Sequence, residues 1–392
     1  MDRSLRGRAA VVGVGQTTYY RHGSSPHAEA RLALEAILHA CEDAGISPTQ
    51  VDGFSSYSND RNDGPRMAAA LGCRELRFSN MFWGGGGGGA AGALQNAAAA
   101  VACGLADCVV VYRGLAQGQF GRFGRGPAAP HISGEAAHTV PYGVMSAAQM
   151  FAMKVMRFMH DHQVERSALR AIAMASYHHA QQNPLAIMHG RPLSESGYDD
   201  ARWIVEPFRL YDCCQENDGA AALLVVAADA AGDYPHKPCY VLAATSGGPY
   251  RAAAPVHNTP DYASSHFQTV AGRLYAMAGL GPSEVDVLQS YENFTGGVLM
   301  AMVEHGFCHP QEVNDFFTLG NLTAPAGRLP LNTSGGNLAE CYMHGLGLTI
   351  EAVRQIRGTG PNPVPDVEVS MMIGGPMVTP VSACIFGSAA TL

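Results

Sequence analysis

A glycine-rich turn that leads into an expected helix is the stretch that points most clearly to chemistry. It reads Asn-Thr-Ser-Gly-Gly-Asn-Leu-Ala-Glu-Cys-Tyr-Met-His-Gly over residues 332–345. Glycines such as Gly335 and Gly336 let the backbone approach a ligand closely, and the first turn of a helix has N–H groups without partners inside the helix. The stretch therefore favours a ligand site at the start of this helix. A tight turn that only packs the helix is the alternative.

Two other candidate sites stand where expected strands end. Tyr291-Glu292-Asn293-Phe294 closes one strand and enters a helix, and Met371–Met377 carries Gly374 and Gly375 at the end of another. Ligands bind beyond the carboxyl ends of parallel strands in open α/β sheets, so Tyr291 and Asn293 are candidate site residues. The backbone N–H groups at the two glycines can face an oxyanion. The alternatives are that the tyrosine only packs in the core and that the glycines only form a turn.

The cysteines and histidines do not form a metal motif. Ten cysteines are scattered along the chain, and Cys213-Cys214 is an adjacent pair without a C-x-x-C repeat. Sixteen histidines contain no H-E-x-x-H pattern. We therefore expect no zinc site and no disulfide framework, and we assign Cys213-Cys214 a structural role.

Strands and helices alternate along the chain in a way that is typical of a sheet covered by helices. We expect strands at 9–14, 51–57, 107–112, 239–245, 285–291, 367–373 and 381–387. We expect helices at 27–44, 90–103, 146–162, 168–181, 264–278 and from Ser334 to about Ile356. In both halves of the chain a glycine-rich turn, a helix, a glycine stop and a strand follow one another, which indicates an internal duplication.

The predicted organisation is therefore two similar halves and one insertion. Residues 1–114 and 211–235 form the first half, residues 236–392 the second, and residues 115–210 a loop domain inserted over the active site. This division suits a chain of 392 residues, which is long enough for two domains.

Composition restricts the class of protein. Hydrophobic residues make up 47% of the chain and charged residues 15%, which fits a compact enzyme and excludes disorder. The net charge of −8 argues against a nucleic-acid partner. No apolar run reaches the roughly 18 residues of a membrane helix, and the first ten residues lack a signal-peptide core. We expect a cytoplasmic protein without membrane contact.

Taken together, these stretches resemble the thiolase superfamily, in particular its lipid-transfer-protein-like branch. The resemblance covers nearly the whole chain from Ala9 onward. It is strongest in D-C-C-x-E-x-D-G-A-A-A, which begins at Asp212, and in N-x-x-G-G, which begins at Asn332. It implies an α/β thiolase fold: duplicated mixed-sheet halves in five layers, α-β-α-β-α, with an inserted loop domain.

This sequence departs from thiolases at each of their catalytic motifs. The nucleophilic cysteine falls within Trp83–Gly89, which contains no cysteine, and the N-E-A-F motif reads Tyr291-Glu292-Asn293-Phe294. The G-H-P histidine, ten residues after Asn332, is replaced by Tyr342, and Met372 stands where C-x-G has its cysteine. Without a thiolate, an acyl-enzyme and ping-pong thiolysis are not available.

The pattern is similar to the thiolase-related steroid side-chain aldolases of bacterial sterol and bile-acid breakdown, which also carry tyrosines at these two places. The resemblance implies a retro-aldol lyase that cleaves a 17-hydroxy steroid β-hydroxyacyl-CoA to a 17-ketosteroid and propionyl-CoA or acetyl-CoA. It also implies a homodimer within an α2β2 complex with a DUF35 partner, which has an OB-fold and a zinc ribbon. The chain itself is then expected to hold no cofactor.

A retro-aldol step needs a base, hydrogen-bond donors for the enolate oxygen and an acid for the α-carbon. We assign the base to Tyr291 and the acid to Tyr342, and the reverse assignment stays open. His344 is a third catalytic candidate, and Asn293, Gly335, Gly336, Gly374 and Gly375 are candidates for substrate or oxyanion contacts. The alternatives are a non-catalytic acyl-CoA or lipid carrier, and a cysteine-independent thioesterase or Claisen-type acyltransferase. Polar groups kept at two motif positions favour catalysis.

Overall fold

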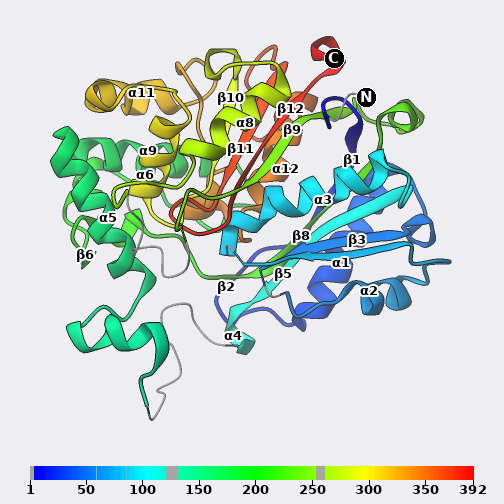
Figure 1. Cartoon of the computed structure of the whole chain (residues 1–392), viewed down its shortest axis with the longest axis horizontal. Helices are drawn as coiled ribbons and strands as arrows, with labels where there is room; N and C mark the ends of the chain where they lie inside the picture. The colour runs from blue at the N-terminus through cyan, green and yellow to red at the C-terminus, as the bar shows by residue number, and fades with distance from the viewer. Residues whose placement is uncertain (1–3, 59, 85, 121–130, 253–260) are drawn as a thin grey trace.

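A computed structural model describes residues 4–392 except 59, 85, 121–130 and 253–260, and its backbone is organised around one large mixed sheet (Figure 1). Ten strands make up this sheet, in the order β10-β11-β12-β9-β1-β8-β5-β3-β4, with β2 paired to β8. The strands are β1 (Ala9–Gln16), β2 (Tyr20–Arg21), β3 (Gly53–Tyr57), β4 (Phe78–Phe82), β5 (Cys108–Ala116), β8 (Asn217–Ala227), β9 (Cys239–Gly247), β10 (Val287–Ser290), β11 (Val369–Gly374) and β12 (Val381–Gly387). A small separate sheet pairs β6 (Trp203–Val205) with β7 (Phe208–Arg209).

The sheet contains the same strand arrangement twice. In the first half, β3 lies between its parallel neighbours β4 and β5, and β8 and β1 follow as antiparallel strands. In the second half, β10 lies between β11 and a parallel bridge at Leu331, and β12 and β9 follow as antiparallel strands. A short pairing of β1 with β9 joins the two halves. The repeated order fits the internal duplication that the sequence indicates.

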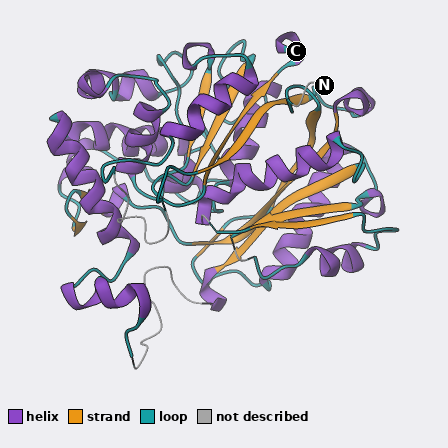
Figure 2. Ribbon diagram, in the orientation of Figure 1, coloured by secondary structure: helices purple, strands orange, loops and turns teal. Residues whose placement is uncertain are grey.

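Helices cover both outer faces of the halves and fill the space between them (Figure 2). The helices are α1 (Glu29–Ala44), α2 (Gly64–Leu71), α3 (Ala90–Ala102), α4 (Gln117–Phe120), α5 (Ala147–His162), α6 (Arg166–Ala180), α7 (Glu195–Asp199), α8 (Gln268–Ala278), α9 (Thr295–Glu304), α10 (Val313–Phe316), α11 (Leu319–Leu322) and α12 (Leu346–Arg357). The central helices α3 and α12 each contact strands of both halves, whereas α1 packs on β1, β8 and β5, and α8 packs on β9 and β12. The predicted five-layer thiolase fold is confirmed.

The predicted insertion contributes α4, α5, α6 and α7. Helix α5 begins at a capping box in which Ser146 and Gln149 bind each other's backbone N–H, and its buried residues pack against α9. Helix α6 packs against α9, α11 and the turn that follows Gly335. Residues 121–130 of the insertion lie outside the described residues, and the predicted boundaries of the halves remain predictions.

Apolar side chains form separate cores on the faces of the sheet, because each face of a strand is covered by a helical layer. One large cluster surrounds α9 and the outer face of β10–β12, a second surrounds α3 and α12, and a third lies under α1. Among the helices described, none combines the length and apolarity that a membrane span requires.

The helix that we expected to run from Ser334 to about Ile356 is broken, so this prediction was wrong. One π-helical turn covers Gly336–Glu340, the chain is non-helical through residue 345, and α12 starts only at Leu346. His344 and Gly345 have φ angles of 50° and 87°, in the left-handed region that a right-handed helix cannot include. The break places Tyr342 and His344 on a loop in the interior of the molecule.

Candidate active site

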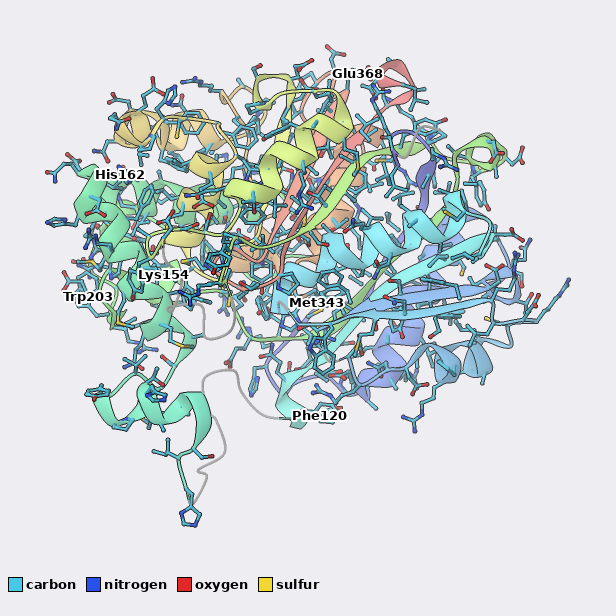
Figure 3. The ribbon with its side chains drawn as sticks, viewed as in Figure 1. Phe120, Lys154, His162, Trp203, Met343 and Glu368 are labelled. Atoms are coloured by element: carbon cyan, nitrogen blue, oxygen red, sulfur yellow. The ribbon has the colours of Figure 1, made fainter. Side chains whose placement is uncertain are left out.

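A cavity of about 500 Å³ lies where the carboxyl end of β10 meets the 341–345 loop and the start of α5. Its wall is formed by Gly86, Gly87, Ser146, Ala147, Ala148, Phe151, Ile204, Cys213, Cys214, Glu216, Tyr291, Asn293, Phe294, Tyr342, His344, Gly375 and Val378. Met343, the buried residue between Tyr342 and His344, lies in the interior, while Lys154 and Trp203 belong to the insertion (Figure 3). The cavity thus gathers segments from both halves and from the insertion.

Tyr291 and Tyr342 are in direct contact at this cavity. The hydroxyl of Tyr291 donates a hydrogen bond to the hydroxyl oxygen of Tyr342 at 2.7 Å, and both side chains are buried. The backbone N–H of Tyr291 binds the carbonyl oxygen of Ile373 at 2.8 Å, and that of Tyr342 binds Oδ1 of Asn217 at 3.0 Å. The structure therefore brings together the two tyrosines that the sequence placed 51 residues apart.

The electrostatic surroundings of the two phenols differ. Burial raises the pKa of both hydroxyls well above the usual range, so both are neutral phenols near pH 7. The hydrogen bond from Tyr291 and the positive charge of Arg113 act in the opposite direction on the pKa of Tyr342. The same hydrogen bond raises the pKa of Tyr291, because that hydroxyl is the donor. Of the two, Tyr342 is thus the better placed to carry a negative charge.

His344 lies beside this pair on the same loop. Its ring centroid is 5.2 Å from that of Tyr342, in an edge-to-face arrangement. Burial, followed by the charges of Arg113 and Arg61, holds the pKa of its imidazole well below the ordinary value. The ring is therefore neutral at pH 7 and can donate or accept one hydrogen bond at each nitrogen, depending on its tautomer.

The glycine run faces the same cavity at the place where a thiolase has its cysteine. Gly86 and Gly87 are part of the wall, and Gly85 lies outside the described residues. Gly87 directly abuts the ring of Tyr291, so no room is left for a side chain at this position. A cysteine at position 87 is therefore incompatible with the observed place of the Tyr291 ring.

The remaining predicted contact residues divide into two groups. Asn293 and Gly375 belong to the cavity wall, and the side-chain Oδ1 of Asn293 accepts a hydrogen bond from the N–H of Phe294 at 2.8 Å. Gly374 ends β11 next to them. Gly335 and Gly336 lie outside the wall and pack against Ala180 and Glu292, where they form the turn that leads to Tyr342. Their predicted part in substrate or oxyanion contacts stays a prediction.

Glu292 holds the Gly336 turn in place. Its carboxylate accepts hydrogen bonds from the backbone N–H of Asn337 at 2.9 Å and from Oγ of Ser176 at 3.1 Å. Burial raises the pKa of this carboxyl group to about 8. Since Glu292 follows Tyr291 directly, it links the strand that carries one tyrosine to the loop that carries the other.

Sequence reasoning missed several cavity residues. Cys213, Cys214 and Glu216 lie in the wall, although we had assigned the cysteine pair a structural role. Burial raises the pKa of Cys214 well above its ordinary value and that of Cys213 to about 12, so both are neutral thiols and poor nucleophiles. The available signal was the D-C-C-x-E-x-D-G-A-A-A stretch itself, one of the two stretches where the resemblance to thiolases is strongest.

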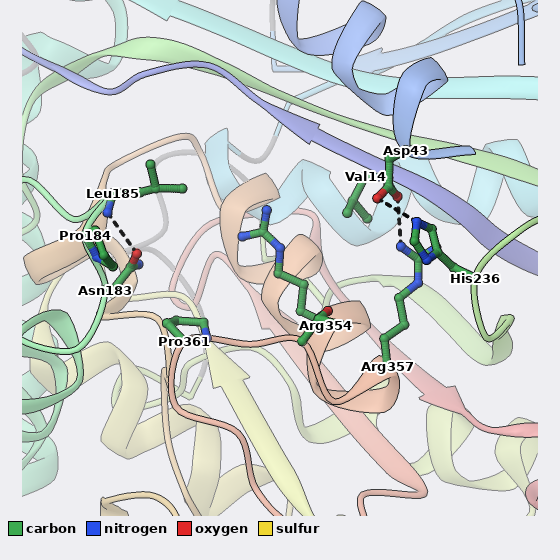
Figure 4. A pocket seen from close by; sticks show the side chains of 10 residues that line it. Val14, Asp43, Asn183, Pro184, Leu185, His236, Arg354, Arg357 and Pro361 are labelled. Atoms are coloured by element: carbon green, nitrogen blue, oxygen red, sulfur yellow. Dashed lines mark hydrogen bonds and ion pairs between the residues drawn. The ribbon is translucent and has the colours of Figure 1, made fainter. Parts of the chain in front are cut away.

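A second cavity, of about 400 Å³, contains none of the predicted site residues (Figure 4). It lies beside the end of α12, where Asp43 binds Arg357 at 2.9 Å and His236 at 3.2 Å. Within the part of the chain that the structure describes, no group of three or more His, Cys, Asp or Glu side chains is arranged to hold a metal ion. Of these two cavities, only the one at the tyrosine pair contains residues that the sequence singled out.

Comparisons with known proteins identify relatives of the chain. A family model of the thiolase C-terminal domain matches residues 250–388. The chain is 38% identical to 17-hydroxy-3-oxo-4-pregnene-20-carboxyl-CoA lyase of Mycobacterium tuberculosis over 98% of this chain and 100% of that protein. It is 38% identical to a steroid side-chain-cleaving aldolase of Thermomonospora curvata, over 98% and 99% of the two chains. A solved structure of an Ltp2-ChsH2(DUF35) aldolase superposes with a TM-score of 0.91 and 36% identity, over 99% and 100% of the two chains.

Proposed function

The chain belongs to the thiolase-fold family of steroid side-chain-cleaving aldolases, and we propose on this basis that it cleaves the side chain of a 17-hydroxy steroid acyl-CoA. The products of this retro-aldol reaction are a 17-ketosteroid and propionyl-CoA or acetyl-CoA. The observation that carries the proposal is the hydrogen-bonded pair of Tyr291 and Tyr342, which stands in the cavity where a thiolase has a cysteine.

We assign the base to Tyr342 and the acid to Tyr291, the reverse of the order that we favoured from the sequence. A phenolate at Tyr342 keeps the hydrogen bond from Tyr291 and faces the charge of Arg113. The phenolate takes the proton of the substrate hydroxyl, the bond between the hydroxyl carbon and the α-carbon breaks, and its electrons form the thioester enolate. Tyr291 then protonates the α-carbon.

The contact between the two hydroxyls also explains how the site returns to its starting state. After the reaction Tyr342 holds the substrate proton and Tyr291 has lost one. A proton can pass between the two oxygens across their 2.7 Å hydrogen bond, which restores the phenolate at Tyr342. His344 and the N–H groups near Gly375 are the proposed donors to the enolate oxygen, because both lie in the cavity wall.

The rest of the cavity wall suits a steroid. Ala148, Phe151, Ile204, Phe294 and Val378 contribute apolar surface to the same wall that contains the tyrosines. An apolar ring system gains free energy by leaving water for such a wall, and the few polar groups fix its orientation. In this arrangement the hydroxyl and the thioester reach the tyrosines, and the charged part of coenzyme A remains outside.

We also propose a homodimer. Within the described residues β4 pairs only with β3, and Ser79, Asn80 and Met81 at this edge are exposed. The opposite edge of the sheet is covered, because Leu288 of β10 exchanges backbone hydrogen bonds with residues 330 and 332. An open edge strand is a ready site for pairing, and two β4 strands can join across a twofold axis.

A DUF35 protein is the proposed second partner, since the solved relative is an Ltp2-ChsH2(DUF35) aldolase. The family resemblance implies that this partner carries a zinc ribbon. Light scattering of the chain alone and with a DUF35 protein tests both interactions. We expect a dimer alone and an α2β2 assembly with the partner. A monodisperse monomer in both samples would contradict the assembly.

The activity is tested with 17-hydroxy-3-oxo-4-pregnene-20-carboxyl-CoA, in the presence of the partner. Mass spectrometry should find the 17-ketosteroid and propionyl-CoA in equal amounts. The same acyl-CoA without the 17-hydroxyl group is the control and should stay intact, because a retro-aldol step needs that hydroxyl. Release of free coenzyme A without ketosteroid would indicate a thioesterase, and saturable binding without turnover would indicate a carrier.

A further inference from the structure

Arg113 is a buried cation on β5, close to the tyrosine pair but outside the cavity wall. Its guanidinium is 6% exposed and lies 3.2 Å from the carboxylate of Asp60, which is 1% exposed. Nη1 also donates to the carbonyl oxygen of Tyr57 at 2.8 Å, and Nε is buried without a hydrogen-bond partner among the described residues. Removing a charge from water is costly, so a buried arginine with an unused donor calls for an explanation.

The contacts of Arg113 lead directly to the loop that carries Tyr342. Tyr57 is fully buried, and its hydroxyl donates to the carbonyl oxygen of His344 at 2.9 Å. The guanidinium carbon of Arg113 lies 5.5 Å from the centroid of the Tyr57 ring. Asp60, Arg113, Tyr57 and His344 thus form a continuous chain of contacts. This chain ends two residues after Tyr342, at the left-handed residue that breaks the helix.

Among the arginines near this loop, Arg113 is distinguished by its burial. Arg61 also acts on the imidazole of His344, but its side chain is 46% exposed and forms an ion pair with Glu29 at 2.8 Å. Exposed charges are screened by water and salt, whereas buried charges are screened much less. The groups around Tyr342 that titrate or carry charge include Tyr57, Arg113, Cys214, Tyr291 and His344. Arg113 is the cation in this set.

We propose that Arg113 is a positioning residue for the reaction: through Tyr57 it holds the backbone at His344, and its buried positive charge favours the phenolate of Tyr342. Asp60 limits this effect, because its carboxylate partly neutralises the guanidinium. This inference rests on the proposed function. It adds the charge of Arg113 to the hydrogen bond from Tyr291 as a source of acidity for a phenol that burial alone would make a very weak acid.

The experiment compares Arg113→Gln, Arg113→Lys and Asp60→Asn in the complete protein with its partner. Fluorine NMR of 3-fluorotyrosine placed at position 342 reports the phenol titration without turnover, and the pH dependence of kcat/KM reports the reaction. Arg113→Gln should raise the apparent pKa from the NMR titration and the apparent pKa from the kcat/KM profile, each by about one pH unit. At a fixed pH it should lower kcat/KM by about tenfold. Arg113→Lys should keep most of the effect, because it keeps the charge.

Asp60→Asn should shift the apparent pKa of the Tyr342 phenol in the opposite direction to Arg113→Gln. Loss of the counter-ion should lower the apparent pKa of the phenol. If Arg113→Gln does not fold, Arg113→Lys decides the question, because it keeps the charge but not the planar set of donors. A purely structural role then predicts loss of activity, whereas the proposal predicts a phenol pKa and an activity close to those of the parent. Folded variants whose phenol titration and pH profile both match the parent would overturn the proposal. If the parent protein forms no ketosteroid, the proposed function fails, and the phenol titration still measures the effect of the Arg113 charge separately.

Discussion

A Cβ atom at position 87 would lie 2.0 Å from Cε2 and from Cζ of Tyr291. Non-bonded carbon atoms meet at about 3.5–4.0 Å, so the tyrosine ring and a side chain at position 87 cannot share the space. The observed place of the Tyr291 ring therefore requires a glycine at position 87, within the stretch where the resemblance to thiolases places the nucleophile.

The first prediction tests this exchange with Gly87→Ala. The added methyl group must displace the Tyr291 ring, so we expect a destabilisation of roughly 1–3 kcal/mol and a loss of most activity. In a Tyr291→Ala background the same change should cost little stability, because the ring is gone. Denaturant unfolding of the four proteins in this cycle measures the coupling. Equal costs in both backgrounds would mean that the ring and the glycine are not in conflict.

The second prediction concerns the phenol hydroxyls. Tyr291→Phe and Tyr342→Phe keep the rings and should each lower kcat by roughly 10²–10⁴-fold. If the hydroxyls were only structural, each change would cost on the order of 1 kcal/mol of stability and leave catalysis intact. The two variants should differ in kind, since Tyr342→Phe blocks ketosteroid formation, whereas Tyr291→Phe slows solvent deuterium uptake into propionyl-CoA.

A matched control for these variants is Tyr275→Phe. Its hydroxyl lies 3.9 Å from Sδ of Met371, and the residue does not belong to the cavity wall. This variant should retain the parent rate. Parent rates in all three variants would rule out the tyrosine pair and return attention to His344.

The third prediction is a pH profile. Burial raises the pKa of Tyr291 and of Tyr342 well above the usual value near 10. The base must lose its proton before it acts, so kcat/KM should rise with pH throughout the range from 6 to 9. A carboxylate base with an ordinary pKa near 4 would instead give a flat profile over this range. Initial rates at constant ionic strength distinguish the two.

The fourth prediction concerns the cysteines of the cavity. Cys213 and Cys214 are neutral thiols in the wall, so their loss should leave the chemistry unchanged. We expect that Cys213→Ala/Cys214→Ala retains activity within a few-fold. Iodoacetamide should inhibit the parent slowly by adding bulk to the cavity, and the double variant should resist it. Exposed Cys103 provides the control, because Cys103→Ala should leave the sensitivity of the parent unchanged.

A loss of 10²-fold or more in the double variant would mean that a thiol takes part in catalysis. That result would contradict the tyrosine mechanism and reopen the possibility of covalent chemistry at this site.

The fifth prediction links stability to pH through Glu292. Burial raises the pKa of its carboxyl from an ordinary value of 4.5 to about 8 in the folded protein. The folded state binds the proton more tightly, so this contribution to stability is present below about pH 4.5 and is lost as pH rises through 8. Glu292→Gln should therefore flatten the fall in stability between pH 5 and pH 9, by an amount on the order of 1–3 kcal/mol.

Thermal unfolding at several pH values measures this effect. Glu75→Gln, at an exposed position, should leave the pH dependence of the parent unchanged. An identical slope for Glu292→Gln and the parent would show that the buried carboxyl does not titrate in this range. Part of the pH dependence of stability should persist in Glu292→Gln, because burial also raises the pKa of Glu340 to about 7.

Local features of the chain could be predicted well. The strand predicted at 381–387 agrees with β12, and the helix predicted at 146–162 differs from α5 by one residue, because apolar periodicity and flanking turn residues are local signals. The motif positions of Tyr291 and Tyr342 were also available from spacing alone. The thiolase fold and the aldolase family, inferred from these stretches, agree with the comparisons.

The helix break at residues 341–345 could not be predicted in this way. The segment reads as a continuation of a helix, and propensity is a weak signal that tertiary contacts override. Here two of the contacts, those of Asn183 and Asn217, come from distant segments. Glu340 binds Ser334 and Asn183, and Asn217 binds the backbone of Tyr342.

The sequence by itself determined which groups are available for chemistry, namely two tyrosines and no cysteine at the thiolase motif positions. It also indicated a duplicated α/β fold that carries them. Only the tertiary structure decided how these groups meet. It placed the two hydroxyls 2.7 Å apart and brought Cys214 into the cavity wall. It also placed the guanidinium of Arg113 against the backbone carbonyl of Tyr57. These relationships join strands and loops that lie 50 or more residues apart in the chain. They depend on how helices and sheet pack in three dimensions, which no local pattern of residues encodes.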